Sequence, residues 1–371
     1  MKSSRARARR EALGQPRKRS AGPAPVNHAP PAPVPTSIPT RPLGHNGPAV
    51  TLVGFGSWAA GGAGYAFGWG AQDDDASVAA MRHAVGLGVN WIDTAPVYGL
   101  GHAEELVGRL LRELPAGDRP LVFTKCGISW HPADPSAPTR RDLHPDVIRR
   151  ECDASLRRLG VDAIDLYQFH WPDETGVPVE DSWGTMLDLV REGKVRYPAV
   201  SNFNADLLAR CEALGHVQAL QPPFSLIHRQ YAERELPWCL EHGTGVIAYS
   251  PMQSGILTDK FSVERVRELP DDDWRKRTPE FQPGQAEKNV ALRDALRPVA
   301  ERHGTAVSAV AVAWVTQWPG LTAAIVGARS PEQVDGWIGA ATLQLTADDV
   351  DEIARAVERT GAGKGPVRPA A

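Results

Sequence analysis

Cysteine is scarce in this chain, with four in 371 residues. Four scattered cysteines are too few for a disulfide framework or a paired-cysteine metal site, so we expect a reducing, cytoplasmic location. The 11 histidines lack paired ligand spacing, and no metal site is predicted. Long apolar runs are missing too. None approaches the roughly 18 residues that span a bilayer, so no membrane span is expected.

The chain also lacks a large excess of charge of either sign. Its formal net charge at pH 7 is -3, from 41 Lys and Arg against 44 Asp and Glu. Such a balance provides no overall field to attract nucleic acid or an anionic membrane, so we expect neither as a partner. Nothing in the sequence indicates the oligomeric state. Hydrophobic residues make up 42% of the chain, enough for a sizeable core.

The two ends of the chain differ in composition from its middle. Residues 1–39 are basic and then proline-rich, with almost no large apolar side chain, and this composition predicts a disordered tail rather than a targeting or nucleic-acid-binding segment. Residues 361–371 are rich in glycine, proline and alanine and predict a flexible C-terminal tail. Residues 40–360 are expected to form one globular domain.

Short β-rich apolar runs repeat along this domain, and most intervals between them have helical periodicity. Alternating strands and helices indicate parallel pairing. Eight such units fit a closed (β/α)8 TIM barrel of the α/β class, with an open doubly wound sheet as the alternative. The predicted strands are residues 50–54, 90–94, 121–125, 164–170, 197–201, 217–221, 246–250 and 324–327.

A glycine-rich segment follows the first of these runs. Gly54, Gly56 and Ala59 match the dinucleotide-binding pattern G-x-G-x-x-G/A, and residues 73–75 are acids near the position of a ribose ligand. The match is weak because the next residues, GGAGYAFGWG, are broken by glycine. They do not predict the helix whose N-terminus holds a pyrophosphate. We interpret the segment as a mobile loop over the barrel mouth.

Four polar residues, Asp93, Tyr98, Lys125 and His170, interrupt, end or closely follow strands that are otherwise apolar. Strand ends converge at one face of a barrel, so we expect these side chains to meet. Taken singly, each residue also has an ordinary structural interpretation. His170 would be a hydrogen-bonded core histidine, Asp93 and Lys125 a structural ion pair, and Tyr98 a packing residue.

At these positions the chain resembles the aldo-keto reductase family, whose active site consists of Asp, Tyr, Lys and His on a (β/α)8 barrel. The similar segments are GFGSWA, WIDTAPVYGLGHAEELVGRLL, FTKCG, SLRRLGVDAIDLYQFHWPD, AVSNF, IAYSPMQSGILTDK and IVGARSPEQV. The resemblance runs from about Arg41 to Arg359 and is strongest to members related to potassium-channel β subunits and to microbial pyridoxal or sugar reductases. It implies an enzyme that reversibly reduces an aldehyde or ketone with NAD(P)H.

The chemistry of the four residues supports this expectation. A phenol with a pKa near 10 is a poor proton donor at neutral pH, so Tyr98 needs an acidifying neighbour. A lysine cation within about 4 Å favours the phenolate, and we expect Lys125 to supply it. Asp93 keeps the buried ammonium charged, and His170 orients the substrate carbonyl.

The resemblance also implies a cofactor site. Ser201, Asn202 and Gln221 are suited to bind the nicotinamide carboxamide, and Tyr249 matches the ring that stacks on the nicotinamide. Arg329 matches a cation that meets the adenosine 2′-phosphate, which favours NADP, with NAD as the alternative. The remaining expected cofactor residues are Ser250, Pro251, Met252, Gly255, Leu257, Gly327, Ser330 and Gln333.

Two departures from the family pattern concern the cofactor and the pocket. Gly336 and Trp337 stand where many relatives carry a Glu-Asn pair for the adenine edge, which weakens the expectation of NADP. Phe224 replaces a tyrosine common in relatives and is expected to alter the substrate pocket. The expected pocket residues, for which ordinary packing is an equal alternative, are Trp58, Tyr98, Trp130 and Trp171.

Two other functions stay open. Lys125 is a candidate Schiff-base nucleophile, but a lysine paired with Asp93 stays protonated and cannot attack. The other alternative is a nucleotide-sensing regulatory subunit with little turnover, because such relatives keep the same four residues. The physiological substrate and the reaction direction are not predicted.

Overall fold

The computed structural model describes residues 38–65, 67–131, 133–134, 137–269 and 273–369. Apart from its last two residues, the predicted N-terminal tail lies outside these ranges. Within them, no helix combines the length and the apolar character that a membrane crossing requires.

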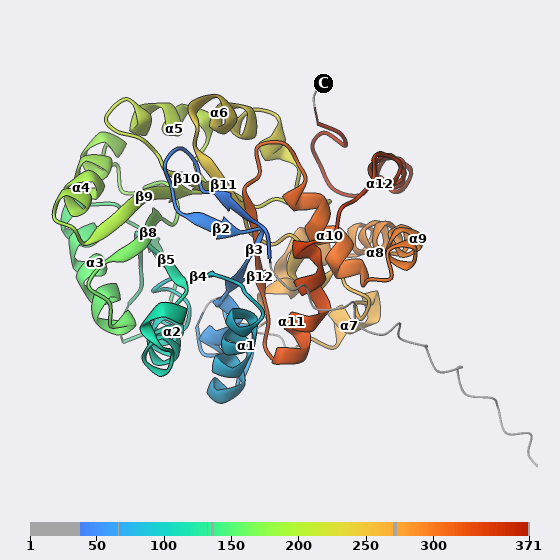
Figure 1. The fold of residues 1–371 in the computed structure, drawn as a ribbon, viewed down its shortest axis with the longest axis horizontal. Coiled ribbons are helices and arrows are strands. Elements are labelled where there is room, and N and C mark those ends of the chain that lie inside the picture. Colours follow the sequence, from blue (N-terminus) through green and yellow to red (C-terminus); the bar gives the residue numbers. More distant parts are fainter. Residues whose placement is uncertain (1–37, 66, 132, 135–136, 270–272, 370–371) are drawn as a thin grey trace, which may run out of the picture. The chain divides into compact units, whose positions relative to one another are not determined.

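Parallel strands close into a barrel in which each strand pairs with the preceding and the following barrel strand, and the last barrel strand pairs with the first (Figure 1). This arrangement confirms the predicted TIM barrel and excludes the open doubly wound sheet. The barrel strands are β3 (Val53–Gly56), β4 (Trp91–Asp93), β5 (Leu121–Cys126), β8 (Ile164–Phe169), β9 (Val195–Ser201), β10 (Ala219–Gln221), β11 (Gly245–Ala248) and β12 (Ala323–Gly327).

Helices connect the strands and surround the barrel (Figure 1). Local signals set their ends: α3 has proline in its first turn and ends before Gly160, whose φ is 68°. The helices are α1 (Asp74–Gly86), α2 (His102–Glu113), α3 (Pro145–Leu159), α4 (Val179–Arg191), α5 (Ala205–Glu212), α6 (Glu235–His242), α7 (Val263–Arg267), α8 (Gln285–Ala295), α9 (Arg297–Arg302), α10 (Val307–Thr316), α11 (Pro331–Ile338) and α12 (Ala347–Thr360).

The first predicted strand, 50–54, is divided in the structure. Its beginning belongs to β2 (Ala49–Thr51), which pairs with β1 (Thr40–Pro42) in an antiparallel hairpin, and the barrel strand β3 starts after Leu52. Local hydrogen bonds explain the break. The Thr51 hydroxyl donates to the Val53 carbonyl over 2.8 Å, and the Thr51 N–H donates to the Asn90 side chain over 2.8 Å.

One cluster of buried hydrophobic side chains fills the barrel interior. Leu43 and Val50, from the hairpin, belong to this cluster. Trp91 is the largest side chain in this set, and its ring nitrogen donates to the Thr51 carbonyl over 3.0 Å. A Cβ at Gly54 would lie 2.1 Å from the Trp91 ring. The glycine that begins the apparent dinucleotide pattern is therefore needed for packing.

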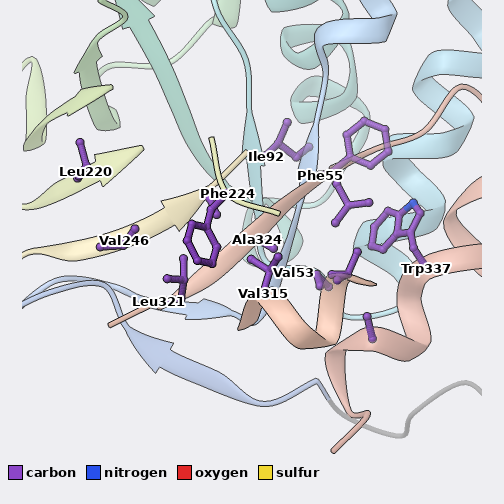
Figure 2. Packing of buried hydrophobic residues seen from close by; sticks show 14 of the residues in the cluster. Val53, Phe55, Ile92, Leu220, Phe224, Val246, Val315, Leu321, Ala324 and Trp337 are labelled. Atoms are coloured by element: carbon purple, nitrogen blue, oxygen red, sulfur yellow. The ribbon is translucent and has the colours of Figure 1, made fainter. Parts of the chain in front are cut away.

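A second core lies between the outer faces of the strands and the helices (Figure 2). Phe224 stacks on Trp314 at a ring separation of 5.8 Å and an interplanar angle of 9°. Trp337 is also buried in this core, with 2% exposure. The expectation that Phe224 shapes the substrate pocket is thus wrong, because its ring faces the helices.

Residues 361–369 pack against the loop that follows β10. The Lys364 N–H donates to the Ile227 carbonyl over 3.0 Å, and the Arg229 N–H donates to the Lys364 carbonyl over 2.9 Å. A Cβ at Gly363 would lie 2.2 Å from the Ile227 carbonyl oxygen. These contacts differ from the flexible tail expected from composition, because glycine here permits close backbone approach.

An alanine substitution at Gly54 tests the packing of the barrel interior, and a second one on a surrounding helix serves as its control. In Gly54→Ala the new methyl group overlaps the Trp91 ring, so we expect the free energy of unfolding to fall by about 2 kcal/mol or more. The matched control is Gly184→Ala in α4, where an added Cβ meets nothing within 4 Å. We expect it to raise that free energy by about 0.5–1 kcal/mol. Urea denaturation measures both, and similar effects in the two variants would contradict this account.

Candidate active site

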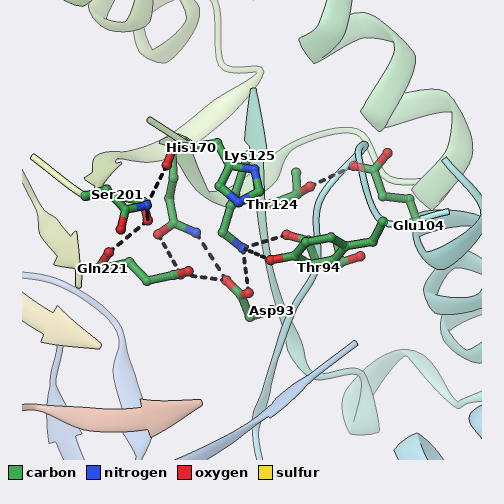
Figure 3. A network of polar contacts seen from close by, with 11 residues as sticks. Asp93, Thr94, Glu104, Thr124, Lys125, His170, Ser201 and Gln221 are labelled. Carbon is green, nitrogen blue, oxygen red and sulfur yellow. Dashed lines mark hydrogen bonds and ion pairs between the residues drawn. The ribbon is translucent and has the colours of Figure 1, made fainter. Parts of the chain in front are cut away.

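The structure brings the four predicted polar residues together where the barrel strands end, and Figure 3 shows Asp93, Lys125 and His170 in this group. Asp93 ends β4, Lys125 lies in β5, His170 follows β8, and Tyr98 lies in the turn after β4. The Lys125 Nζ is 2.6 Å from Asp93 Oδ1 and 3.5 Å from the Tyr98 hydroxyl oxygen. The Tyr98 and His170 rings meet edge to face, with centroids 5.8 Å apart.

The Lys125 ammonium is buried and fully hydrogen-bonded. Its side chain is 0% exposed and that of Asp93 is 3% exposed. Besides Asp93 and Tyr98, it donates to the Thr94 carbonyl over 2.9 Å. Three N–H donors thus have three acceptors, which limits the cost of burying the charge.

The pKa shifts show how burial acts on the site. Burial raises the pKa of Tyr98 well above its ordinary value, and the Asp93 charge raises it further. Burial also lowers the pKa of Lys125, while Asp93 opposes that shift. Burial and then the Lys125 cation lower the pKa of His170 far below its ordinary value. Desolvation thus outweighs the acidifying effect expected of Lys125, and the net pKa of Tyr98 stays above its ordinary value.

Two glutamines complete the surroundings of Asp93 (Figure 3). The Gln221 amide nitrogen donates to Asp93 Oδ2 over 2.8 Å and to the Gln168 side-chain oxygen over 2.9 Å. The Gln168 amide nitrogen is 3.3 Å from the same carboxylate oxygen. Gln221 was expected at the nicotinamide but faces Asp93 here. Gln168 was not predicted, although a polar residue inside the apolar run IDLYQF was a usable signal.

A buried carboxylate fixes the strand that carries Lys125. Glu104 in α2 has a side chain that is 0% exposed, and it accepts from Arg158 Nε over 2.6 Å. It also accepts from the hydroxyl of Thr124, the residue before Lys125, over 2.7 Å. The α2 and α3 helices are thereby tied to β5 directly beside the ammonium.

The predicted nicotinamide-binding residues form a connected polar group. The Tyr249 hydroxyl donates to the Asn202 side-chain oxygen over 2.9 Å, and Asn202 Nδ2 lies 3.0 Å from the Ser201 hydroxyl oxygen. Nearby, Gly327 of β12 is in register with Gly56 of β3. A Cβ at Gly327 would lie 3.3 Å from the Gly56 carbonyl. Gly56 and Gly327 have no side chains, so a ligand can approach the backbone at these strand ends. The hydroxyl and amide groups of the polar group described above are of the types that bind a nicotinamide dinucleotide.

The predicted phosphate ligand Arg329 follows β12 and is held by the loop after β3. It donates to the Gln72 side-chain oxygen over 2.5 Å and to the Ala71 carbonyl. Its own N–H donates to the Gln333 side chain over 2.9 Å. Burial, followed by the charge of Arg275, lowers its pKa. The Asp273 carboxylate opposes this shift and pairs with Arg275 over 2.6 Å.

Aromatic rings cover Tyr98. Trp58 stacks on Tyr98, with centroids 6.0 Å apart, and on Trp274, with centroids 5.2 Å apart. Trp69 meets both tryptophans edge to face at 5.4 and 5.6 Å. We call Trp58, Trp69 and Trp274 the tryptophan roof. The loop after β3 thus covers the barrel mouth, as expected, and Trp274, which was not predicted, joins it from the loop after β11.

The other expected pocket residues differ in their surroundings. Trp171 packs with Tyr98 against a small apolar group, Ala95, Val97 and Ile128. Trp130 follows β6 (Ile128–Ser129) and is half-buried. Within the part of the chain that the structure describes, no group of three or more His, Cys, Asp or Glu is placed to hold a metal ion.

Comparisons with known proteins agree with this geometry. The family model described as "Aldo/keto reductase family" matches residues 52–358. An aldo-keto reductase of Bacillus subtilis (strain 168) is 32% identical over 86% of this chain and 93% of its own length. The NADH-specific methylglyoxal reductase of Escherichia coli (strain K12) is 31% identical over 86% of this chain and 99% of its own length.

Among solved structures, the glycerol dehydrogenase of Gluconobacter oxydans matches with a TM-score of 0.79 and 36% identity, over 90% of this chain and 98% of that one. Family model, sequence relatives and fold therefore point the same way. The chain belongs to the aldo-keto reductase family.

Proposed function

We propose that this protein reduces an aldehyde or ketone to an alcohol, reversibly, with Tyr98 as the general acid. The observation that carries the proposal is the position of Lys125 Nζ, 2.6 Å from Asp93 Oδ1 and 3.5 Å from the Tyr98 hydroxyl oxygen. Carbonyl reduction needs a hydride at carbon and a proton at oxygen. A bound nicotinamide cofactor supplies the hydride, and the proton has to come from the chain.

Tyr98 begins a reduction as a neutral phenol. Its raised pKa keeps the proton in place at neutral pH, where it is available to the carbonyl oxygen. Proton transfer leaves a phenolate beside the Lys125 ammonium. At about 4 Å and an effective dielectric near 20, such a pair gains about 4 kcal/mol before desolvation is counted. Lys125 thus acts on the charge that develops during the reaction.

His170 orients the substrate in this proposal. Its lowered pKa keeps the ring neutral, so one ring nitrogen carries a proton and can donate to the carbonyl oxygen. The neutral ring also adds no second cation beside Lys125. In the oxidation direction, the same phenolate accepts the proton from the alcohol.

We further propose that Ser201, Asn202 and Tyr249 bind the nicotinamide end of the cofactor, together with Gln221 after its amide turns from Asp93. The wider contact set follows the family pattern. It consists of Ser250, Pro251, Met252, Gly255, Leu257, Gly327, Ser330 and Gln333.

NADP is the proposed cofactor, with Arg329 as the ligand of its 2′-phosphate. The support is that the Arg329 guanidinium is held in place by the Gln72 side chain and the Ala71 carbonyl, while burial disfavours its charge, so a phosphate would stabilise it. NAD is the alternative, because the Escherichia coli relative is NADH-specific. Trp337 lies in the core and is not part of the proposed adenine site.

A nucleotide-sensing subunit with little turnover is the second candidate function. The contact between the tryptophan roof and Tyr98 is compatible with it, since a ring over the phenol restricts access to the proton donor. The first experiment below separates the two candidates.

Substituting Tyr98→Phe is expected to lower kcat for aldehyde reduction by about 10²–10⁴-fold, because the proton donor is removed. Nucleotide affinity, measured by fluorescence titration, should change little. The matched control is Tyr231→Phe, a half-buried tyrosine of the 3-10 helix Gln230–Ala232, which should retain wild-type kcat. If wild type and Tyr98→Phe consumed NADPH equally slowly with every aldehyde and ketone tested, the sensing function would be supported instead.

Replacing Arg329 with alanine should weaken NADPH binding more than NADH binding. A charge-assisted hydrogen bond contributes roughly 1.5–3 kcal/mol, so the Kd for NADPH should rise about 10- to 100-fold. The Kd for NADH should change far less. Calorimetric titration of both nucleotides provides the comparison, and equal losses would contradict the assignment of Arg329 to the 2′-phosphate.

A further inference from the structure

A cation outside the proposed catalytic residues lies close to the candidate active site. In the loop after β5, the strands β6 and β7 (Arg140–Arg141) form a short antiparallel ribbon. The Arg141 guanidinium carbon lies 4.1 Å from the centre of the Trp171 ring. The Arg141 side chain is 36% exposed, so its charge is accessible to a ligand.

The ring beneath Arg141 connects it to the catalytic tyrosine. Trp171 directly follows His170 in the chain and packs with Tyr98 against the same small apolar group. The Trp171 ring, with the Arg141 guanidinium over it, thus shares an apolar contact group with Tyr98.

A network of backbone contacts holds the loop that carries this ring. The Asp173 carboxylate accepts from the N–H groups of Thr175, Gly176 and Val177 over 2.6, 2.7 and 3.0 Å. It also accepts from the N–H of Leu143, two residues beyond Arg141, over 2.9 Å. The loop and the ribbon are thus joined, which positions the cation before any ligand arrives.

The charge of Arg141 affects two ionisable side chains of the candidate active site. It adds to burial and to Lys125 in lowering the pKa of His170. At Tyr249 it opposes burial, which raises the pKa of that phenol. One guanidinium therefore acts on the proposed carbonyl-orienting ring and on the proposed nicotinamide-stacking ring.

The donors of Arg141 are only partly used. Among the described residues, its one hydrogen-bonding side-chain partner is Glu174, which accepts from Nη1 over 2.7 Å and is 57% exposed. An exposed ion pair of this kind is weak, so an oxyanion can displace it or share the guanidinium. A carboxylate matches the planar fork of donors.

We propose that Arg141 binds a carboxylate carried by the substrate, so that the preferred substrates are short aldehydes or ketones with a carboxylate at the other end. This inference rests on the proposed carbonyl reduction and specifies its substrate class. The carbonyl end meets Tyr98 and His170, and the acidic end meets the guanidinium stacked on Trp171. Arg141 determines specificity and takes no part in proton transfer.

Succinic semialdehyde and butanal form a suitable substrate pair, because they have the same chain length and differ in the terminal carboxylate. We expect wild-type kcat/KM to favour succinic semialdehyde by about tenfold or more, in the range of a charge-assisted hydrogen bond. In Arg141→Gln that preference should fall about tenfold, mainly through KM, with butanal nearly unchanged. Added salt should weaken the wild-type preference, since the pair is partly exposed.

Arg140→Gln is the matched control. Arg140 precedes Arg141 on β7 and is exposed, and neighbouring strand residues point to opposite faces, so this variant should keep the wild-type preference. Glu174→Gln should strengthen the preference by removing the competing carboxylate. Equal losses on both substrates in Arg141→Gln, or an equal change in Arg140→Gln, would overturn the proposal.

Two further measurements separate this proposal from its alternatives. Glyceraldehyde 3-phosphate compared with glyceraldehyde tests phosphate as the oxyanion, and a larger Arg141-dependent preference there would overturn the choice of carboxylate. Calorimetric binding of succinate needs no turnover. Succinate binding that weakens about tenfold in Arg141→Gln, but not in Arg140→Gln, supports the carboxylate site even if carbonyl reduction fails. If the protein reduces butanal but Arg141→Gln changes neither the preference for succinic semialdehyde nor the binding of succinate, the carboxylate site is refuted and the proposed carbonyl reduction still stands.

Discussion

A single buried ammonium organises the candidate active site. Lys125 has no exposure to solvent, and its charge is tolerated because Asp93, Thr94 and Tyr98 each accept a hydrogen bond from the ammonium. Removing any acceptor leaves part of the charge unpaired in a low-dielectric environment. The glutamines on the far side of Asp93 and the Glu104 contact to Thr124 both serve to keep that geometry.

Burial has opposite effects on two neighbouring side chains. It disfavours the charged form of Lys125, and it favours the protonated form of Tyr98. In the proposed reaction, desolvation keeps the phenol neutral until a substrate oxygen takes the proton, and the lysine then stabilises the phenolate. A site of this kind needs no acidic resting phenol. It needs a donor that is loaded at neutral pH and a fixed charge that lowers the energy of the product of proton transfer.

Much of this arrangement is predictable from the sequence, and the failures have physical causes. Asp93, Lys125 and His170 stand out because they interrupt or end apolar strands, and the barrel topology then implies their meeting. Trp274 was missed because its contact with Trp58 joins two distant loops, and stacking leaves no periodic pattern. The net direction of the Tyr98 pKa shift does not follow from the sequence, which reveals a neighbour's charge but not the loss of water around the phenol.

The hairpin of β1 and β2 has a consequence for how molecules reach Tyr98. Leu43 and Val50 fill the barrel interior from that side and are themselves 0% exposed. These side chains close the barrel interior on the hairpin side, so the proposed ligands have to approach Tyr98 from the opposite end, where the tryptophan roof lies.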